Sequence, residues 1–223
     1  MHAKYYNEKG NPVPSVTTVL KILYKDGLLE WANFIGRRGI DYKRFLEEKA
    51  NLGSLVHEMI ESDLLQRDPI ILTTPAMLKE ASAVAQKFKV AKEALKISNV
   101  ITELSLSSER FGGTLDLIAD IDMNGEPVTI LGDFKTSKKP YLTQFIQLGA
   151  YLDLVKKNRP EIYEKIQFCI IFSITSQKVT MQYVTKENCE KYFTRLFYSL
   201  LDTYTYWEEI KRLEPTISNL KIY

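Results

Sequence analysis

The 223-residue sequence has few cysteines, little net charge and no long apolar run, and each scarcity excludes a class of protein. Its two cysteines, Cys169 and Cys189, are too few for a four-thiolate zinc or iron–sulfur site, so no iron–sulfur cluster is expected and we interpret them as reduced thiols. No apolar stretch approaches the roughly 20 residues that span a bilayer. Met1 to Lys9 is too polar for a signal peptide. We therefore expect a soluble, intracellular protein with no membrane partner.

The charges nearly cancel, with 30 Lys and Arg against 28 Asp and Glu and a net charge of +2. A protein that holds nucleic acid through its overall charge is usually more basic, so any such binding must come from a local patch. The other proportions, 45% hydrophobic and 26% charged residues, are those of a globular chain with one sizeable core. We expect a single domain over residues 1–223.

The first part of this domain, residues 1–97, is predicted to be mainly helical. The chain begins as a short extended arm or a hairpin with a turn at residues 7–10, and Ser15 has the character of a helix N-cap. Apolar residues at helical spacing predict further helices. These lie around residues 31–35 and 42–49, from Gly53 onward as a separate helix, and over residues 75–96.

The second part, residues 98–223, is predicted to contain the sheet. Alternating apolar and polar residues predict strands over 99–108, 111–122 and 128–137, and Asn124-Gly125 is a strong hairpin signal. After a helix over 141–157, a buried strand and its partner are expected at 166–174 and 178–184. A long helix over 187–213 precedes a tail, residues 217–223, that we expect to dock on the body. This order predicts an α/β sandwich with one mixed sheet flanked by helices.

Three polar residues occupy strand positions that would otherwise be apolar: Asp116, Asp133 and Lys135. Asp133 and Lys135 are two apart, which places them on one face, and the hairpin makes Asp116 a neighbour. Two carboxylates beside a lysine are costly to bury without a purpose, and hard oxygen ligands favour Mg²⁺ or Mn²⁺. Such a site suits phosphodiester hydrolysis. The alternative is a solvated surface ion pair on a wet sheet face.

An ordered set of residues resembles a known family of enzymes. His57, Asp116, Asp133, Lys135, Gln147 and Tyr151 follow the pattern of the PD-(D/E)XK nuclease superfamily, and specifically of its RecB-like exonuclease branch. The lead-in over residues 14–20 and Trp31 resemble phage exonucleases of this branch and the mitochondrial genome maintenance exonuclease. Leu115 stands where the motif name has proline. The resemblance implies a restriction-endonuclease-like core with an N-terminal helical region, in the cytoplasm of a prokaryotic or virus-infected cell.

The resemblance also implies roles for individual residues. Asp116 and Asp133 would ligate Mg²⁺ or Mn²⁺, with the His57 ring and the Phe134 carbonyl as further ligands. Lys135 would be the catalytic lysine. Gln147 and Tyr151, one helical turn apart, would contact substrate or position the lysine. Glu103, the lone acid in an apolar stretch, is a possible additional ligand.

The expected activity is metal-dependent hydrolysis of DNA from single-stranded ends, in replication, recombination or repair. Arg37, Arg38, Lys43 and Arg44 lie close to Trp31 and Phe34, a mixture that suits single-stranded DNA, although a solvated basic helix face has the same composition. Two alternatives stay open. One is a catalytically silent DNA-binding module, and the other is a partner-dependent nuclease subunit of a recombination or CRISPR-type complex.

Overall fold

The computed structural model describes residues 4–23 and 28–217, and its centre is a five-stranded sheet. The strands lie in the order β3 (Ser98–Ser107), β4 (Gly112–Met123), β5 (Glu126–Lys135), β6 (Ile166–Ile174) and β7 (Val179–Thr185). All neighbours are antiparallel except β5 and β6, which are parallel. The parallel pair requires a crossover, which α5 (Leu142–Asn158) and α6 (Pro160–Tyr163) supply. The predicted mixed sheet is confirmed.

The β4–β5 hairpin turns at the two residues predicted from the sequence. Asn124 and Gly125 both have positive φ, 59° and 90°. A two-residue turn of this kind matches the right-handed twist of the strands that it joins. Its register pairs Met123 with Glu126 and Leu117 with Gly132. The hairpin therefore places Leu117, the residue after Asp116, beside Gly132, the residue before Asp133.

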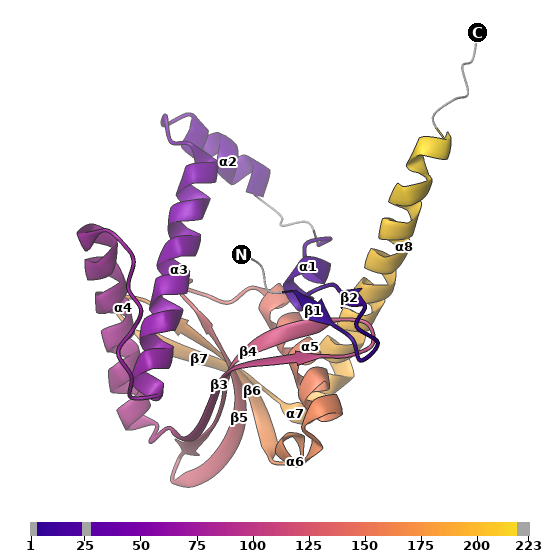
Figure 1. Cartoon of the computed structure of the whole chain (residues 1–223). Coiled ribbons are helices and arrows are strands. Elements are labelled where there is room, and N and C mark those ends of the chain that lie inside the picture. The colour runs from indigo at the N-terminus through magenta and orange to yellow at the C-terminus, as the bar shows by residue number, and fades with distance from the viewer. Residues whose placement is uncertain (1–3, 24–27, 218–223) are drawn as a thin grey trace.

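Helices cover both faces of the sheet (Figure 1). On one face α3 (Tyr42–Leu64) and α4 (Pro75–Ala94) bury a core that includes Phe88, Phe134 and Phe172. On the other, α1 (Val16–Leu20), α5 and α8 (Arg195–Ile217) bury a second core. The N-terminal helical region thus provides one of the two helical layers.

The helix α3 differs from the sequence-based expectation. Two helices were predicted, with a break before Gly53, but residues 42–64 form one helix of 23 residues. A glycine inside a helix costs only about 1 kcal/mol relative to alanine. Asp41 caps the N-terminus by accepting from the backbone N–H of Lys43, and a buried face that includes Val56 and Ile60 holds the rest. The helix α2 (Leu28–Gly36) lies at its N-terminal end (Figure 1).

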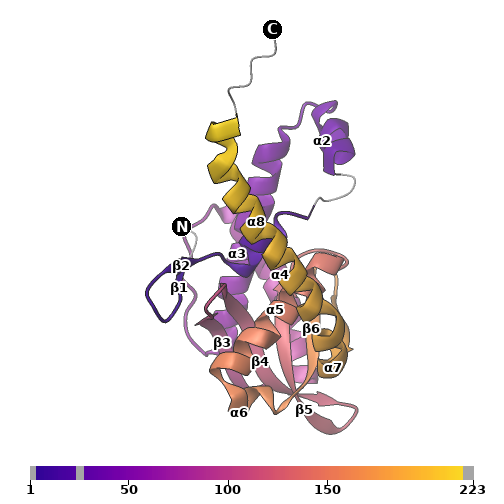
Figure 2. The ribbon, with the colours of Figure 1, turned by 90° about the vertical axis from the view of Figure 1, so that its right-hand side faces the viewer.

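The C-terminal helix was predicted over residues 187–213 and is subdivided in the structure. It begins as α7 (Lys186–Asn188), continues as a π-helical segment η1 (Cys189–Thr194), and becomes α8, which extends beyond the sheet (Figures 1 and 2). The predicted tail was residues 217–223; Ile217 is the last residue of α8, and residues 218–223 lie outside the described part. At the other end, β1 (Tyr5–Tyr6) and β2 (Pro12–Val13) form the expected small hairpin. No helix among the described residues has the length and apolar character needed to cross a membrane.

Candidate functional site

A cleft of about 620 Å³ opens between α3 and the sheet, where β4 and β5 separate. Its wall on the helix side includes Lys49, His57 and Glu61, and its floor includes strand residues. Those strand residues, and the loop residue that follows β5, are Glu103, Thr114, Asp116, Phe134, Lys135 and Thr136. Most of the sequence-predicted site residues therefore face one open cavity.

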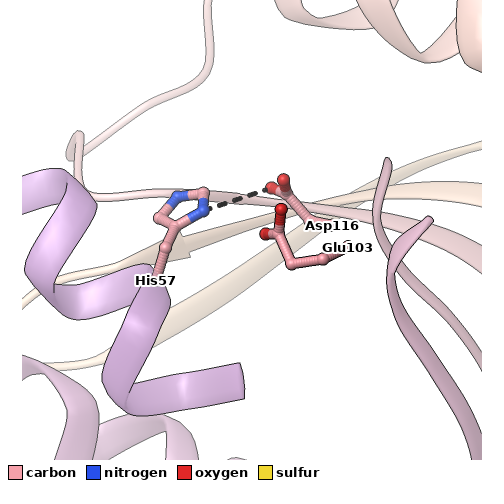
Figure 3. Close-up of side chains that lie close together, drawn as sticks. All are labelled: His57, Glu103 and Asp116. Carbon is pink, nitrogen blue, oxygen red and sulfur yellow. Dashed lines mark ion pairs between the residues drawn. The ribbon is translucent and has the colours of Figure 1, made fainter. Parts of the chain in front are cut away.

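Three ligand-type side chains meet inside this cleft. One possible ligand atom from each of His57, Glu103 and Asp116 lies within 4.8 Å of the other two. Figure 3 shows the imidazole reaching from α3 toward the two carboxylates, which come from the neighbouring strands β3 and β4. A nitrogen and two carboxylate oxygens at this spacing form a donor set suited to a divalent cation.

The hydrogen bonds of His57 define the protonation of its ring. Its Nε2 lies 2.9 Å from the carbonyl oxygen of Phe134, and since a carbonyl only accepts, Nε2 carries the proton. In the neutral ring Nδ1 then has a lone pair. That lone pair faces Oδ2 of Asp116 at 3.6 Å. Two electron-rich atoms so placed need a proton or a cation between them, so Nδ1 is the ring atom available to either.

Asp116 and Glu103 lie at an irregular point of the sheet. Leu115 and Ile118 belong to the core under α5, although they are three residues apart, while Leu117 belongs to the core under α3 and α4. The strict alternation of sides is therefore interrupted at Asp116. The paired residues of β4 and β5 end at Leu117. On the Asp116 side of Leu117 the two strands are linked instead through a side chain, because Asp116 Oδ2 accepts a hydrogen bond from the backbone N–H of Phe134 at 2.8 Å.

Glu103 lies opposite Asp116, between the pairs Thr102↔Leu117 and Leu104↔Leu115. Its φ of 47° is in the left-handed region, which is rare for a residue with a side chain and costs about 1–3 kcal/mol. Partial desolvation in the cleft raises its pKa, and the charges of Asp116 and Glu61 raise it further. The cleft therefore concentrates negative charge around Glu103, whose backbone is also strained. A bound cation would reduce the repulsion between these charges.

Asp133 and Lys135 form a buried ion pair next to this cluster. The Asp133 residue is 0% exposed, and Lys135 Nζ lies 2.5 Å from its Oδ2. Within the described part of the chain neither oxygen of Asp133 accepts a hydrogen bond of normal geometry. Burial raises the pKa of Asp133 to about 6 against the attraction of Lys135. Burial lowers the pKa of Lys135, but Asp133 and Asp116 outweigh it, so that pKa lies above its ordinary value.

Gln147 and Tyr151 lie one turn apart on α5, as predicted. Gln147 Nε2 donates to the Tyr151 hydroxyl at 2.7 Å. Tyr151 is 4% exposed, and its ring packs so closely on Gly113 that a Cβ there would lie 2.6 Å from it. The ring therefore offers no open face on which a base could stack, and the hydroxyl is the part of the side chain that makes a polar contact. Burial raises its pKa well above the ordinary value, as do Asp133 and Asp116 nearby.

The predicted metal ligands are assembled in part. His57, Asp116 and the Phe134 carbonyl are direct neighbours, and Glu103 joins them. Asp133 is not part of that group of three and instead holds Lys135. The signal for Glu103 in the sequence was its isolation among apolar residues. The irregular backbone that turns it toward the cleft left no such signal.

No protein-family model matches the chain, and no curated protein matches it in sequence. Similar solved structures include an alkaline exonuclease (LHK-Exo) from Laribacter hongkongensis, at 11% identity over 94% of this chain and 95% of that one, with a TM-score of 0.46. LHK-Exo in complex with dAMP matches at 14% identity over 74% and 85%, with a TM-score of 0.42. SSO0001 matches at 20% identity over 49% and 52%, with a TM-score of 0.29. At these identities and TM-scores the likeness carries no argument about this chain's activity, which must come from its own side chains.

Proposed function

We propose that the protein is a DNA exonuclease that uses a divalent metal ion, Mg²⁺ or Mn²⁺. The observation that carries the proposal is that His57 Nδ1 faces Asp116 Oδ2 at 3.6 Å, with Glu103 completing the cluster. The neighbouring pair of Asp133 and Lys135 supports it. Opposed ionisable groups gathered in and beside one cleft are typical of a functional site, and a metal-assisted hydrolytic site is one that uses them.

The residues present fit a hard divalent cation. His57, Glu103 and Asp116 would hold it, and Asp133 and the Phe134 carbonyl are further predicted ligands. The carboxylate of Asp133 suits this role, because it is buried with the Lys135 ion pair as its one neutralising contact among the described residues, and a cation would stabilise it further. When bound, such an ion supplies the positive charge that activates water and stabilises a phosphoryl transition state.

The other side chains perform the remaining tasks. Lys135 holds a positive charge, 21% exposed at the edge of the cleft, where it can orient a water molecule or neutralise charge on phosphate. Asp133 fixes the lysine by their ion pair. Tyr151 accepts from Gln147, so its own O–H proton remains available to donate toward the nearby acids.

We further propose that single-stranded DNA reaches the cleft along α2 and the N-terminal half of α3. Arg37, Arg38 and Lys43 are exposed there, and Arg38 lies 4.0 Å from the centre of the Phe34 ring. The helix α3 continues from this group to His57, about 20 Å away at 1.5 Å per residue. Cations beside exposed aromatic rings suit a strand whose bases are unpaired.

Digestion of end-labelled DNA tests the proposal. Single- and double-stranded substrates labelled at either end are incubated with Mg²⁺, Mn²⁺ or EDTA, with the Asp116→Ala variant in parallel. We expect metal-dependent shortening from an end, lost in the variant. Asp120→Ala is the matched control, because Asp120 lies on the same strand but is bound by Asn99 and Thr129 instead.

The other outcomes distinguish the alternatives. A folded protein that binds DNA and degrades none of it is a catalytically silent module. A protein that becomes active only on addition of a partner complex is a nuclease subunit. Internal cuts in a circular substrate would replace the exonuclease proposal by an endonuclease.

A further inference from the structure

Gly53 lies in the middle of α3, where a glycine makes a helix less stable than an alanine would. A positive φ or a neighbour too close for a Cβ usually explains such a residue, but the φ of Gly53 is not positive. A Cβ at this position would lie 3.6 Å from the hydroxyl oxygen of Thr136, which is an ordinary van der Waals distance. At Gly149, by contrast, a Cβ would lie 2.5 Å from a backbone nitrogen. The fold therefore has room for an alanine at position 53 and none at position 149.

The side of α3 that carries Gly53 forms a wall of the cleft. Lys49, Gly53 and His57 follow one another at intervals of four residues, and all three line the cleft. At 1.5 Å per residue, Lys49 and His57 are about 12 Å apart along the helix, with Gly53 halfway between them. This wall therefore presents a cation, a position without a side chain, and a candidate metal ligand, in that order.

The two ends of this wall differ in charge. Beyond His57 the lining of the cleft is acidic and includes Glu61 and Glu103, which repel phosphate when no metal ion is bound. At the other end, Lys49 Nζ pairs with Glu80 at 3.2 Å, but the two side chains are 53% and 54% exposed. A surface ion pair of this kind contributes little to stability, so a phosphate can take the place of the Glu80 carboxylate.

The hydroxyl of Thr136 lies across the cleft from the missing side chain. Thr136 directly follows Lys135 and lines the cleft, and its Oγ1 is the atom nearest to a Cβ built at position 53. A side chain longer than alanine at that position would therefore cover the hydroxyl. Left uncovered, the hydroxyl can donate a hydrogen bond to a phosphate oxygen.

We propose that Gly53 is a clearance position for the DNA strand. The missing side chain lets the sugar–phosphate backbone lie against α3 between Lys49 and His57, where the Lys49 ammonium and the Thr136 hydroxyl bind its phosphate oxygens. The inference rests on the proposed function for the identity of the ligand, and on the geometry of the cleft for the place where the strand lies. A strand that follows α2 and the N-terminal half of α3 passes this position before it reaches the candidate metal ligands.

Two substitutions at position 53 separate clearance from folding. Gly53→Ala and Gly53→Leu both improve helix propensity, so each should raise the Tm, by about 2–4 °C for alanine in a chain of this size. Both should nevertheless weaken the binding of a single-stranded oligonucleotide, measured by fluorescence anisotropy in EDTA. We expect the Kd to rise about 5-fold for alanine and about 100-fold for leucine, the range that overfilling a close contact produces. Asn51→Ala is the matched control: Asn51 is exposed on the same helix outside the cleft wall, so its variant should raise the Tm and keep the wild-type Kd.

The two phosphate contacts are tested in the same assay. Lys49→Ala and Glu80→Ala both break the ion pair, but only the first removes the cation. Lys49→Ala should flatten the slope of log K against log salt concentration by about 0.7, and Glu80→Ala should keep the wild-type slope. Thr136→Val replaces the hydroxyl by a methyl group, and it should raise the Kd without changing the slope.

Two results would overturn the clearance role. A lower Tm in Gly53→Ala would show that packing requires the glycine, and an unchanged Kd in Gly53→Leu would show that the strand does not pass there. If Gly53→Leu also keeps wild-type kcat/KM in an active nuclease, this inference fails and the proposed function stands. Weaker binding by the Gly53 variants of a protein that degrades no DNA would keep the inference and refute the nuclease activity.

Discussion

The Nδ1 atom of His57 and the Oδ2 atom of Asp116 face each other at 3.6 Å, although Nε2 of the same ring is already committed to the Phe134 carbonyl. The same Oδ2 atom also accepts from the backbone N–H of Phe134. Phe134 therefore holds both side chains, with its carbonyl for the histidine and its amide for the aspartate. Phe134, the residue between Asp133 and Lys135, thus positions two side chains of the cluster and is also a candidate ligand.

The first prediction concerns His57, which Phe134 holds beside Asp116. The variant His57→Ala removes the nitrogen ligand, and we expect the Kd for Mn²⁺ to rise by at least about 10-fold, with loss of nuclease activity. Calorimetric titration of the metal without DNA measures the change directly. Asp120→Asn serves as the control and should bind Mn²⁺ as the wild type does. Unchanged affinity in His57→Ala would place the metal elsewhere.

Lys135 should affect chemistry more than metal binding. We expect Lys135→Ala to lower kcat by about 10²–10³-fold, the usual effect of removing one group that stabilises developing charge. The Mn²⁺ affinity should change little, since lysine is not a ligand. Lys96→Ala is a suitable control, because Lys96 forms its ion pair with Asp122 at the far end of β4. A variant that lost metal binding and activity together would assign Lys135 a structural role.

Asp133 should make the metal-free protein sensitive to pH. Burial raises its pKa from the ordinary 3.8 to about 6, so the folded state binds a proton more tightly than the unfolded state. Stability is then highest below the lower value and is lost as the pH rises to the upper one. Asp133→Asn has no such loss. With EDTA present, the Tm of the variant minus that of the wild type should increase between these two pH values, and the corresponding difference in unfolding free energy should grow by at most about 3 kcal/mol.

Asp120 provides a control of opposite sign. Hydrogen bonds from Asn99 and Thr129 lower the pKa of Asp120, so its contribution to stability is present above the unfolded pKa and is lost as the pH falls. The Tm of Asp120→Asn minus that of the wild type should therefore decrease as the pH rises. A pH-independent difference for Asp133→Asn would contradict the burial of an ionised carboxyl at that position.

The sequence was sufficient for the order of elements and for the convergence of most site residues. Alternation predicted the strands, and Asn124-Gly125 predicted the hairpin that brings Asp116 beside β5. The break predicted before Gly53 was wrong, because helix propensity is a weak local preference that the buried face of α3 overrides. Regular patterns are visible in a sequence because many residues repeat them.

The arrangement around Glu103 could not be predicted in the same way. Its left-handed backbone and the interrupted alternation at Asp116 are single events, held in place by contacts with β5 and α3. The separation of Asp133 from the cluster of three is of the same kind, because it depends on how far β4 and β5 diverge before Leu117, where their pairing begins. Spacing along the chain predicts which residues share a region of the fold. Which of them form the cluster and which form the neighbouring ion pair depends on the three-dimensional structure.

Gly149 allows α5 to pack closely on the π-helical segment η1, a contact that the sequence did not reveal. A Cβ at Gly149 would lie 2.5 Å from the backbone nitrogen of Thr194, and the Thr194 hydroxyl donates to the Gly149 carbonyl at 2.8 Å. We expect Gly149→Ala to destabilise the protein by about 1–3 kcal/mol or more, because backbone atoms cannot move aside easily. Gly36→Ala, with no atom within 4 Å of its Cβ, should be neutral or slightly stabilising in the same thermal melt. Equal melting temperatures would refute the close packing of α5 on η1.

The basic group on α2 should be visible in the salt dependence of DNA binding. Each phosphate that is neutralised on a single strand contributes about −0.7 to the slope of log K against log salt concentration. If Arg37 and Arg38 each contact one phosphate, the double variant Arg37→Ala/Arg38→Ala should flatten that slope by about 1.4 units. Fluorescence anisotropy of a labelled oligonucleotide, with EDTA to prevent cleavage, gives the slope.

The control for this measurement is a lysine that is exposed but lies away from the cleft, Lys96, whose replacement by alanine should leave the slope unchanged. Phe34→Ala tests the aromatic part separately, because stacking of bases on a ring depends little on salt. It should weaken binding while the slope stays as in the wild type. If the arginine variant keeps the wild-type slope, the strand does not pass along α2, and the basic residues there are a solvated helix face.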